Sequence, residues 1–415
     1  MKIQQGGPLK EGWQRLSAKR RQAVIARCEV VRRQGDRALR KGRSVESLTV
    51  DRRLFRQAFG RLTPQARAAL ELACRHVGAL SRRERSALKE FDLKPTLGLT
   101  LYQRLLPLES IGILVPPQGI SAVLAGAIPA AVAGVNRRVV CVEADPEGRI
   151  DPHVLAAAYM CDVTEMFAVG GVDAVSALAH GTVSLAPVSK IIGMGDASVA
   201  AAKQQVADRC SVALATGPTE LLVLADDTAA PEFVAADLLA QAAADPEGSC
   251  VLVTTSLSVA RDTRDQLKRR LRELGPAHGA RGPLRRAQAV VVTGLAAAVD
   301  LANARAPQHL SLLVKRPDEL VGRLRSYGTL LVGPHTPAAL AGRVTGAGAL
   351  LPAWSGAGRE GAVSVSDFLR RVTVQQVDPS AYLRLARAAA TLAELEGADQ
   401  AAESLAERML APAAE

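Results

Sequence analysis

Gln308 and His309 are the residues of this sequence whose type and position are best suited to chemistry. They stand between a helical segment near residues 295–305 and an apolar run over residues 310–314. An imidazole at such a junction can accept or donate a proton near neutral pH. The sequence has six histidines, and the others are interpreted as structural or exposed, except His335 after a predicted strand, whose role stays open.

A second group of candidate residues surrounds the turn that contains Thr219 and Glu220. An apolar run over residues 221–225 follows, and then a predicted helix over residues 231–245 that carries Gln241 near its end. A second apolar run comes next, and strand-helix-strand units of this kind place their active edge where strand ends meet helix starts. We therefore expect the chemistry at that edge.

The elements that must position these residues are short apolar runs separated by Ala-rich helical segments. In a first series the predicted strands lie near residues 110–116, 138–142, 166–171 and 190–195, and in a second near 220–226, 250–255, 288–293, 310–314 and 329–333. Apolar runs without alternation are typical of strands buried on both faces. The sequence therefore predicts an α/β fold with two Rossmann-like, doubly wound parallel sheets.

Helical segments flank these two series. We predict a helical N-terminal arm over residues 1–109, which covers the body or forms a dimer interface, and Rossmann-like domains over residues 110–215 and 216–335. Irregular cleft loops are expected over residues 336–378, and a helical tail over residues 379–415. Because the tail leaves the second domain late in the chain, a partner subunit is one place where it can pack.

The composition narrows the possible functions. Lys and Arg number 52 against 41 Asp and Glu, which gives a formal net charge of +11, and many of the basic residues fall within the first 45. A basic helix can bind phosphates, but a solvated helix is the commoner case. Aromatic residues make up only 3% of the chain, which disfavours binding of single-stranded nucleic acid by base stacking.

Several features are typical of a cytoplasmic protein. The six cysteines are scattered without metal-binding spacing and are interpreted as reduced thiols. The N-terminus has no apolar secretory segment, and no apolar run reaches the roughly 18 residues that a membrane helix needs. We expect a cytoplasmic location and no membrane contact.

Longer motifs connect these segments to one family. They are Gly170-Gly171-Val172-Asp173-Ala174, Lys190-Ile191-Ile192-Gly193-Met194-Gly195-Asp196, Lys203-Gln204-Gln205-Val206, Gly217-Pro218-Thr219-Glu220, Asp237-Leu238-Leu239-Ala240-Gln241-Ala242, Ala306-Pro307-Gln308-His309-Leu310 and Val372-Thr373-Val374-Gln375. In this order, the motifs resemble those of the zinc- and NAD-dependent histidinol dehydrogenases over nearly the whole chain. The resemblance implies two Rossmann-like domains and a helical tail in an intertwined homodimer. It also implies an enzyme that oxidises an amino alcohol, L-histidinol, to the amino acid in two hydride transfers.

The resemblance assigns metal-binding positions, and most of them differ from the family. Of the four zinc ligands that it implies, Gln241 is retained, whereas Ala244, Gly342 and Ala401 replace a histidine, an aspartate and a second histidine. In the tail, Glu396 matches a residue that contacts the substrate in the family. Zinc needs about four donors, so we expect no zinc site.

The acid-base and cofactor positions differ as well. The family's Glu-His pair becomes Gln308-His309, and because an amide cannot accept a proton at neutral pH, water activation for the second oxidation loses its base. Leu114, Asp173 and Asp196 occupy the positions of a tyrosine, a glutamine and an asparagine that contact the cofactor. Two added carboxylates facing a pyrophosphate would repel it, so we expect no NAD.

These differences lead to one main hypothesis and two alternatives. The main hypothesis is a homologue that has lost zinc-dependent, NAD-linked amino-alcohol oxidation and serves as a pseudoenzyme or acts on another small molecule, with a cleft that retains Thr219, Glu220, Gln241, His309 and Glu396. The first alternative is an active NAD-dependent oxidoreductase that acts on an alcohol with altered or no metal, in which Asp399, His335 or Glu360 fills a vacant ligand position. The second alternative is a protein that binds nucleic acid or an acidic partner through its basic N-terminal arm.

Overall fold

The structure is a computed structural model of the 415-residue chain, and it describes residues 1–9, 16–40, 47–213, 217–347 and 349–410. The chain forms two compact units. Unit 1 comprises Met1–Arg85 and Leu108–Phe368, and unit 2 comprises Ser86–Pro107 and Leu369–Glu415. The predicted boundary at residues 215 and 216, and parts of the basic N-terminal segment, lie outside the described residues.

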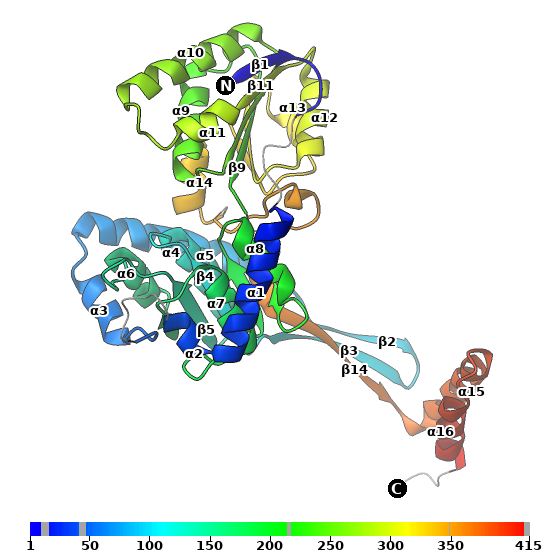
Figure 1. Cartoon of the computed structure of the whole chain (residues 1–415). Coiled ribbons are helices and arrows are strands. Elements are labelled where there is room, and N and C mark those ends of the chain that lie inside the picture. Colours follow the sequence, from blue (N-terminus) through cyan, green and yellow to red (C-terminus); the bar gives the residue numbers. More distant parts are fainter. Residues whose placement is uncertain (10–15, 41–46, 214–216, 348, 411–415) are drawn as a thin grey trace. The chain divides into compact units, whose positions relative to one another are not determined.

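Unit 1 contains a first parallel sheet in the order β6-β5-β4-β7-β8 (Figure 1). Its strands are β4 (Ser110–Val115), β5 (Arg137–Val142), β6 (Glu165–Phe167), β7 (Lys190–Gly193) and β8 (Ser211–Val212). All neighbouring pairs are parallel. Numbered along the chain this is the order 3-2-1-4-5, in which the winding reverses between β4 and β7.

Helices cover the first sheet and share its core. They are α1 (Ala18–Gln34), α2 (Asp36–Arg40), α3 (Arg52–Gly60), α4 (Pro64–Ala87), α5 (Ile120–Ala133), α6 (Pro152–Met160), α7 (Gly171–His180) and α8 (Ala197–Gln205). The α1 side chains of Val24, Cys28 and Val31 are buried in the same cluster as Leu178 of α7. The first long helix is therefore part of the core of the first sheet.

A second parallel sheet repeats this topology in the order β1-β11-β10-β9-β12-β13. Its strands are β1 (Lys2–Gln5), β9 (Glu220–Ala225), β10 (Ser249–Thr254), β11 (Gln288–Val291), β12 (His309–Leu313) and β13 (Thr329–Val332). Its helices are α9 (Pro231–Ala244), α10 (Leu257–Glu273), α11 (Arg281–Arg286), α12 (Leu295–Arg305), α13 (Asp318–Val321) and α14 (Ala338–Val344). Alternate residues of β9 enter two different core clusters, so the sheet is buried on both faces.

Unit 2 is built differently, from an antiparallel sheet and a pair of helices. The strands β2 (Phe91–Thr96), β3 (Leu99–Pro107) and β14 (Leu369–Val377) pair in the order β14-β3-β2. The helices are α15 (Pro379–Leu395) and α16 (Asp399–Leu410). Short 3-10 turns at η1 (Gly356–Gly358) and η2 (Val365–Phe368) precede β14 in unit 1.

The prediction of an α/β fold with two doubly wound parallel sheets and helical ends is confirmed. The sequence patterns do not predict five strands, namely the edge strands β1 and β8 of the two parallel sheets and all three strands of unit 2. These strands carry polar or exposed residues, and β14 pairs with a strand about 270 residues earlier in the chain, so no local apolar run marks them. No helix among the described residues is long and apolar enough to cross a membrane.

Candidate active site

The candidate residues of the second sheet lie at its amino-terminal edge. Glu220 and His309 are the first residues of β9 and β12, and His309 pairs in register with Leu221. Gln241 lies in the last turn of α9, which returns the chain to the same edge. The prediction of a site where strand ends meet helix starts is therefore wrong for these residues, because helix ends and strand starts share the opposite edge of the sheet.

Thr219, Gln241 and Asp245 form a hydrogen-bonded group at this edge. The Gln241 Nε2 donates to Thr219 Oγ1 at 2.5 Å, and the Thr219 backbone N–H donates to Asp245 Oδ2 at 2.7 Å. The Glu247 backbone N–H donates to the other Asp245 oxygen at 2.9 Å. The structure thus brings together two predicted substrate-binding residues and adds Asp245, which sequence reasoning missed although an aspartate before a proline often accepts from nearby backbone N–H groups.

Gln308 is buried and is held at both ends of its amide. Its Oε1 accepts from the Glu220 backbone N–H at 3.2 Å, and its Nε2 donates to the Leu351 carbonyl at 3.3 Å. The side chain therefore ties the start of β9 to the segment around residue 351. This position, predicted as the replacement of a base, has a structural role in the fold.

A buried ion pair lies next to this amide. Arg305 Nη2 donates to Glu220 Oε1 at 2.7 Å, and the Trp354 backbone N–H donates to Glu220 Oε2 at 3.1 Å. Burial raises the pKa of Glu220, and the charge of Arg305 opposes that effect. Trp354 and Ser355 both have left-handed backbone angles, with φ of 54° and 59°, and Ser355 Oγ donates to the Arg305 carbonyl at 2.9 Å. The ion pair and this strained turn hold each other in place.

One ring nitrogen of His309 is buried without a hydrogen bond. Its Nδ1 has no hydrogen-bond partner among the described residues, while the residue as a whole is only half-buried. Burial lowers the pKa of His309 to about 4. The imidazole is therefore neutral at physiological pH and can act as a proton acceptor.

The residues present do not fit a zinc ion with four protein ligands. Across the described ranges of the chain, no three His, Cys, Asp or Glu side chains are grouped closely enough to hold a metal. The Gln241 amide donates to Thr219, and Ala244 and Gly342 offer no side-chain donor atom. Exposed His335 follows β13 at the carboxyl-terminal edge, away from His309, and Glu360 is also exposed. Glu396 and Ala401 belong to unit 2, and their part in the site stays a prediction.

The predicted cofactor positions lie at the carboxyl-terminal edge of the first sheet. The side chain of Leu114 is buried in the core at the end of β4. Asp196 caps α8 by accepting from the Ser198 and Val199 backbone N–H groups, each at 2.9 Å. Arg27 makes two bonds to the Asp173 carboxylate, at 2.6 and 2.7 Å. Arg27 offsets the charge of Asp173, so the expected repulsion of a pyrophosphate depends on Asp196, whose negative charge the helix N–H groups stabilise.

This edge has features that fit a dinucleotide. The winding of the sheet reverses between β4 and β7, and ligands of such sheets bind outside the carboxyl ends of those strands. The helices α5 and α7 begin after Gly119 and Gly170 at this edge, and neither glycine supplies a side-chain cap. The positive end of a helix dipole favours phosphate oxygens. Gly193 has a φ of 107°, and a Cβ there would overlap the backbone of Leu114.

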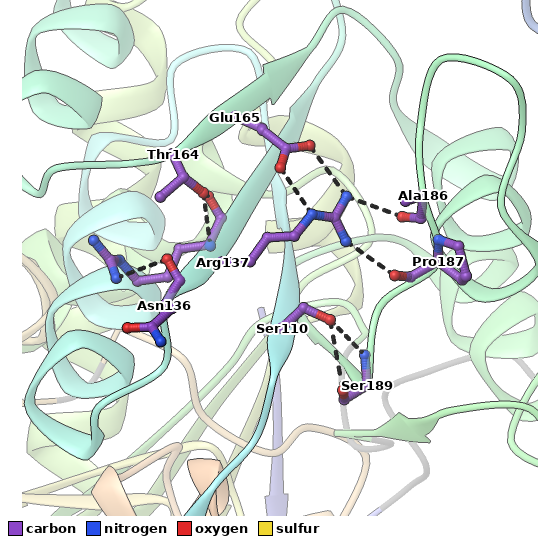
Figure 2. A network of polar contacts seen from close by, with 9 residues as sticks. Ser110, Asn136, Arg137, Thr164, Glu165, Ala186, Pro187 and Ser189 are labelled. Atoms are coloured by element: carbon purple, nitrogen blue, oxygen red, sulfur yellow. Dashed lines mark hydrogen bonds and ion pairs between the residues drawn. The ribbon is translucent and has the colours of Figure 1, made fainter.

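The amino-terminal edge of the first sheet is closed by a polar network instead. Figure 2 shows Arg137 between Glu165 and the carbonyls of Ala186 and Pro187. Its guanidinium donates to both Glu165 oxygens at 2.8 and 3.1 Å and to the two carbonyls at 3.0 and 2.9 Å. The Ser189 backbone N–H donates to Ser110 Oγ at 3.2 Å. These bonds tie the starts of β4 and β5 to the segment before β7.

The fold and the two edges define an α/β protein with two Rossmann-like sheets, one whose winding reverses between β4 and β7 and one with a neutral histidine at its amino-terminal edge. Comparison with known proteins identifies the family within this class. The family model for histidinol dehydrogenase matches residues 14–409. The chain belongs to the histidinol dehydrogenase family.

Individual relatives match along most of their own length. A histidinol dehydrogenase of Bradyrhizobium diazoefficiens is 36% identical over 406 residues, which are 95% of this chain and 94% of the relative. One from Nitrobacter winogradskyi is 40% identical over 345 residues, or 82% and 80% of the two chains. The crystal structure of histidinol dehydrogenase from Elizabethkingia anophelis superposes with a TM-score of 0.89 at 25% identity and covers 99% of this chain and 98% of that one.

These matches overturn the main functional hypothesis drawn from the sequence. The prediction that the chain is a pseudoenzyme or has been redirected is wrong, because relatives that match it nearly end to end carry the name of an enzyme. They favour the alternative of an active oxidoreductase. The hypothesis relied on counting replaced positions. Such a count does not take into account that a replacing residue such as Asp173 can form an ion pair within the fold, here with Arg27.

Proposed function

We propose that this protein is an NAD-dependent dehydrogenase that oxidises the primary alcohol of a small amino alcohol of the histidinol type without a zinc ion. The observation that carries the proposal is the 36% identity over 406 residues to a protein named histidinol dehydrogenase. The absence of a metal-binding group among the described residues supports the zinc-free form.

In this proposal the two edges have different tasks. NAD would supply the hydride acceptor when bound, and the amino-terminal ends of α5 and α7 would hold its phosphates. His309, neutral at physiological pH, takes the proton of the substrate hydroxyl. Thr219 and Gln241, already bonded to each other, orient the polar groups of the substrate.

An assay of the purified protein tests the proposal. With L-histidinol and NAD, and with a chelator present, we expect NADH to form, as followed by its ultraviolet absorbance. His309→Asn keeps the shape of the ring region but removes the base, so turnover should fall by about 10²- to 10⁴-fold. His153→Asn, a change of the same type at an exposed helix start, serves as the control. No NADH with L-histidinol or related amino alcohols would refute the proposal.

We also propose that the protein is a homodimer and works in the cytoplasm. Unit 2 exposes many apolar side chains, among them Leu97 (90% exposed), Leu395 (79%) and Leu392 (59%). Apolar patches of this kind mark interaction sites, and a second copy would cover them. The six cysteines are free thiols, which supports a reducing compartment. Light scattering after gel filtration should give twice the chain mass, and Leu392→Asp with Leu395→Asp should give the monomer mass.

A further inference from the structure

Lys203, in the last turn of α8, is a buried charged residue with no part in the chemistry described above. Its side chain is fully enclosed, with 0% of the residue exposed. Burying an ammonium group is costly unless hydrogen bonds replace the lost hydration. The Lys203 Nζ donates to the Gly193 carbonyl at 2.9 Å and to the Ala213 carbonyl at 3.3 Å. An apolar side chain of the same size would fill the space at lower cost but could not hold these two oxygens.

The two carbonyls lie at the carboxyl-terminal edge of the first sheet. Gly193 is the last residue of β7, and Ala213 directly follows β8. The Ala213 backbone N–H donates to the Ile191 carbonyl at 3.0 Å, which extends the pairing of the two strands. Lys203 thus joins the carboxyl ends of β7 and β8, and sheets of this kind bind their ligands outside these ends.

The peptide group between Gly193 and Met194 is held at both of its ends. Its carbonyl oxygen accepts from Lys203, and its N–H donates to the Leu114 carbonyl at 3.0 Å. Gly193 has a φ of 107°, and a glycine without such bonds has access to many other backbone conformations. The bond from Lys203 therefore helps to fix the orientation of this peptide.

The same bond closes the loop that connects β7 to α8. Asp196 accepts from two backbone N–H groups in the first turn of α8, each at 2.9 Å. A Cβ at Gly195 would lie only 2.4 Å from a methyl carbon of Val199, so the loop packs tightly on the helix. Lys203 reaches back from the end of that helix to the end of the strand. Strand, loop and helix are therefore joined in a ring beside β4, where the winding of the sheet reverses.

Resting on the function proposed above, we propose that Lys203 is a positioning residue for the cofactor. Its ammonium group fixes the peptide after Gly193 and the loop that follows, and this loop forms one wall of the crevice in which the dinucleotide binds. Lys203 does not touch the cofactor, because it is fully buried. A loop that is already ordered loses less conformational freedom when NAD binds, so the affinity is higher.

The protonation of Lys203 links this role to pH. Burial lowers the pKa of Lys203 to about 7, and the carboxylate of Glu360 opposes that shift. The helices α1 and α7, which pack against α8, carry Arg27 and Asp173, and these two side chains are bonded to each other. The charged ammonium makes the stronger bonds to carbonyl oxygens. NAD should therefore favour the charged form and bind more weakly as the pH rises above about 7.

Calorimetric titration with NAD tests the proposal. Lys203→Met keeps the length of the side chain and removes the donor, and we expect it to weaken NAD binding at least about tenfold at a pH near 6.5. The KM for the amino alcohol at saturating NAD should stay nearly the same, because the substrate lies at the second sheet. Equal NAD affinity in Lys203→Met and in the unaltered protein would overturn the inference.

Lys190→Met is the matched control, because Lys190 stands at the other end of the same strand. Its Nζ donates to the Asp367 carbonyl at 2.9 Å and to Asp367 Oδ1 at 2.8 Å, and only 13% of its side chain is exposed. This variant should melt at a lower temperature and bind NAD as the unaltered protein does. A tenfold loss of NAD affinity in both variants would also overturn the inference, since any weakening of β7 would then have the same effect.

The unaltered protein provides a test that does not depend on whether Lys203→Met folds. Titrations in two buffers of different ionisation enthalpy should show that NAD binding takes up about half a proton or more near pH 7.5 and almost none near pH 5.5. No uptake near pH 7.5 would contradict the role of Lys203 and leave the proposed dehydrogenase function intact. Failure of the unaltered protein to bind NAD at all would refute the proposed function, and this inference with it.

Discussion

At the scale of single residues, the environment of His309 determines what its ring can do. The imidazole stands at the first position of a buried strand, with Nδ1 enclosed and without a partner among the described residues. Burial lowers its pKa to about 4, so the neutral form persists well below the ordinary pKa of histidine. A site that depends on this ring as a base keeps its base in mildly acidic solution.

The pH dependence of turnover checks this interpretation. Activity needs the neutral ring, so kcat/KM should stay level down to about pH 5 and fall as the pH drops through about 4. The same shift affects stability, because between about pH 6.5 and 4 the unfolded chain binds a proton that the folded chain does not. Stability should therefore decrease over that window as the pH falls, by an amount on the order of 3 kcal/mol. A loss of kcat/KM centred near pH 6.5 would contradict the interpretation.

At the scale of elements, the central question is how strands and helices bring backbone groups to each edge. In the first sheet, β4 and β7 lie so close at Gly193 that a side chain there would overlap the backbone of Leu114. The Met194 backbone N–H donates to the Leu114 carbonyl at 3.0 Å just beyond the end of β7. This close approach shapes the crevice at which we place the dinucleotide.

Gly193→Ala should disturb that crevice. The residue has a φ of 107°, where alanine is strained, and the added methyl would push β7 away from β4. We expect NAD affinity, measured by calorimetric titration, to weaken by at least about tenfold, which corresponds to roughly 1.4 kcal/mol. Gly322→Ala is the matched control, because its φ is −70° and no atom lies within 4 Å of the added Cβ. Equal NAD affinity in the two variants would show that the strand spacing does not matter for the cofactor.

At the scale of the whole molecule, the chain keeps the architecture of a histidinol dehydrogenase although Gln308, Ala244 and Gly342 stand at the positions where the resemblance implies a glutamate, a histidine and an aspartate. Both sheets keep the order expected of the family, and the superposition on a histidinol dehydrogenase covers 99% of the chain. An enzyme accelerates a reaction by binding the transition state more tightly than the substrate. A neutral base and a bound dinucleotide together supply the proton acceptor and the hydride acceptor that one hydride transfer needs. The scaffold is therefore consistent with a dehydrogenase that works without metal.

Metal analysis checks this at the level of the purified protein. We expect less than stoichiometric zinc after gel filtration in zinc-containing buffer, because the described residues hold no group of metal-binding side chains. Treatment with a chelator should leave both the melting temperature and NADH formation unchanged. Zinc bound at one ion per chain, and lost in a Gln241→Ala variant, would show instead that the site assembles a metal from other groups.

The sequence by itself determined the alternation of buried strands and helices, the parallel sheets and the family. Apolar runs indicate burial from the local sequence, and the central strands of the two large sheets, such as β4, β9 and β10, each have one. Only the tertiary structure decided which edge carries His309, that Arg27 neutralises a carboxylate 146 residues away, and that Gln308 is anchored at both ends. Those contacts join residues that are distant in sequence. A local pattern of residue types does not predict which strand or helix a segment will lie beside after a crossover connection.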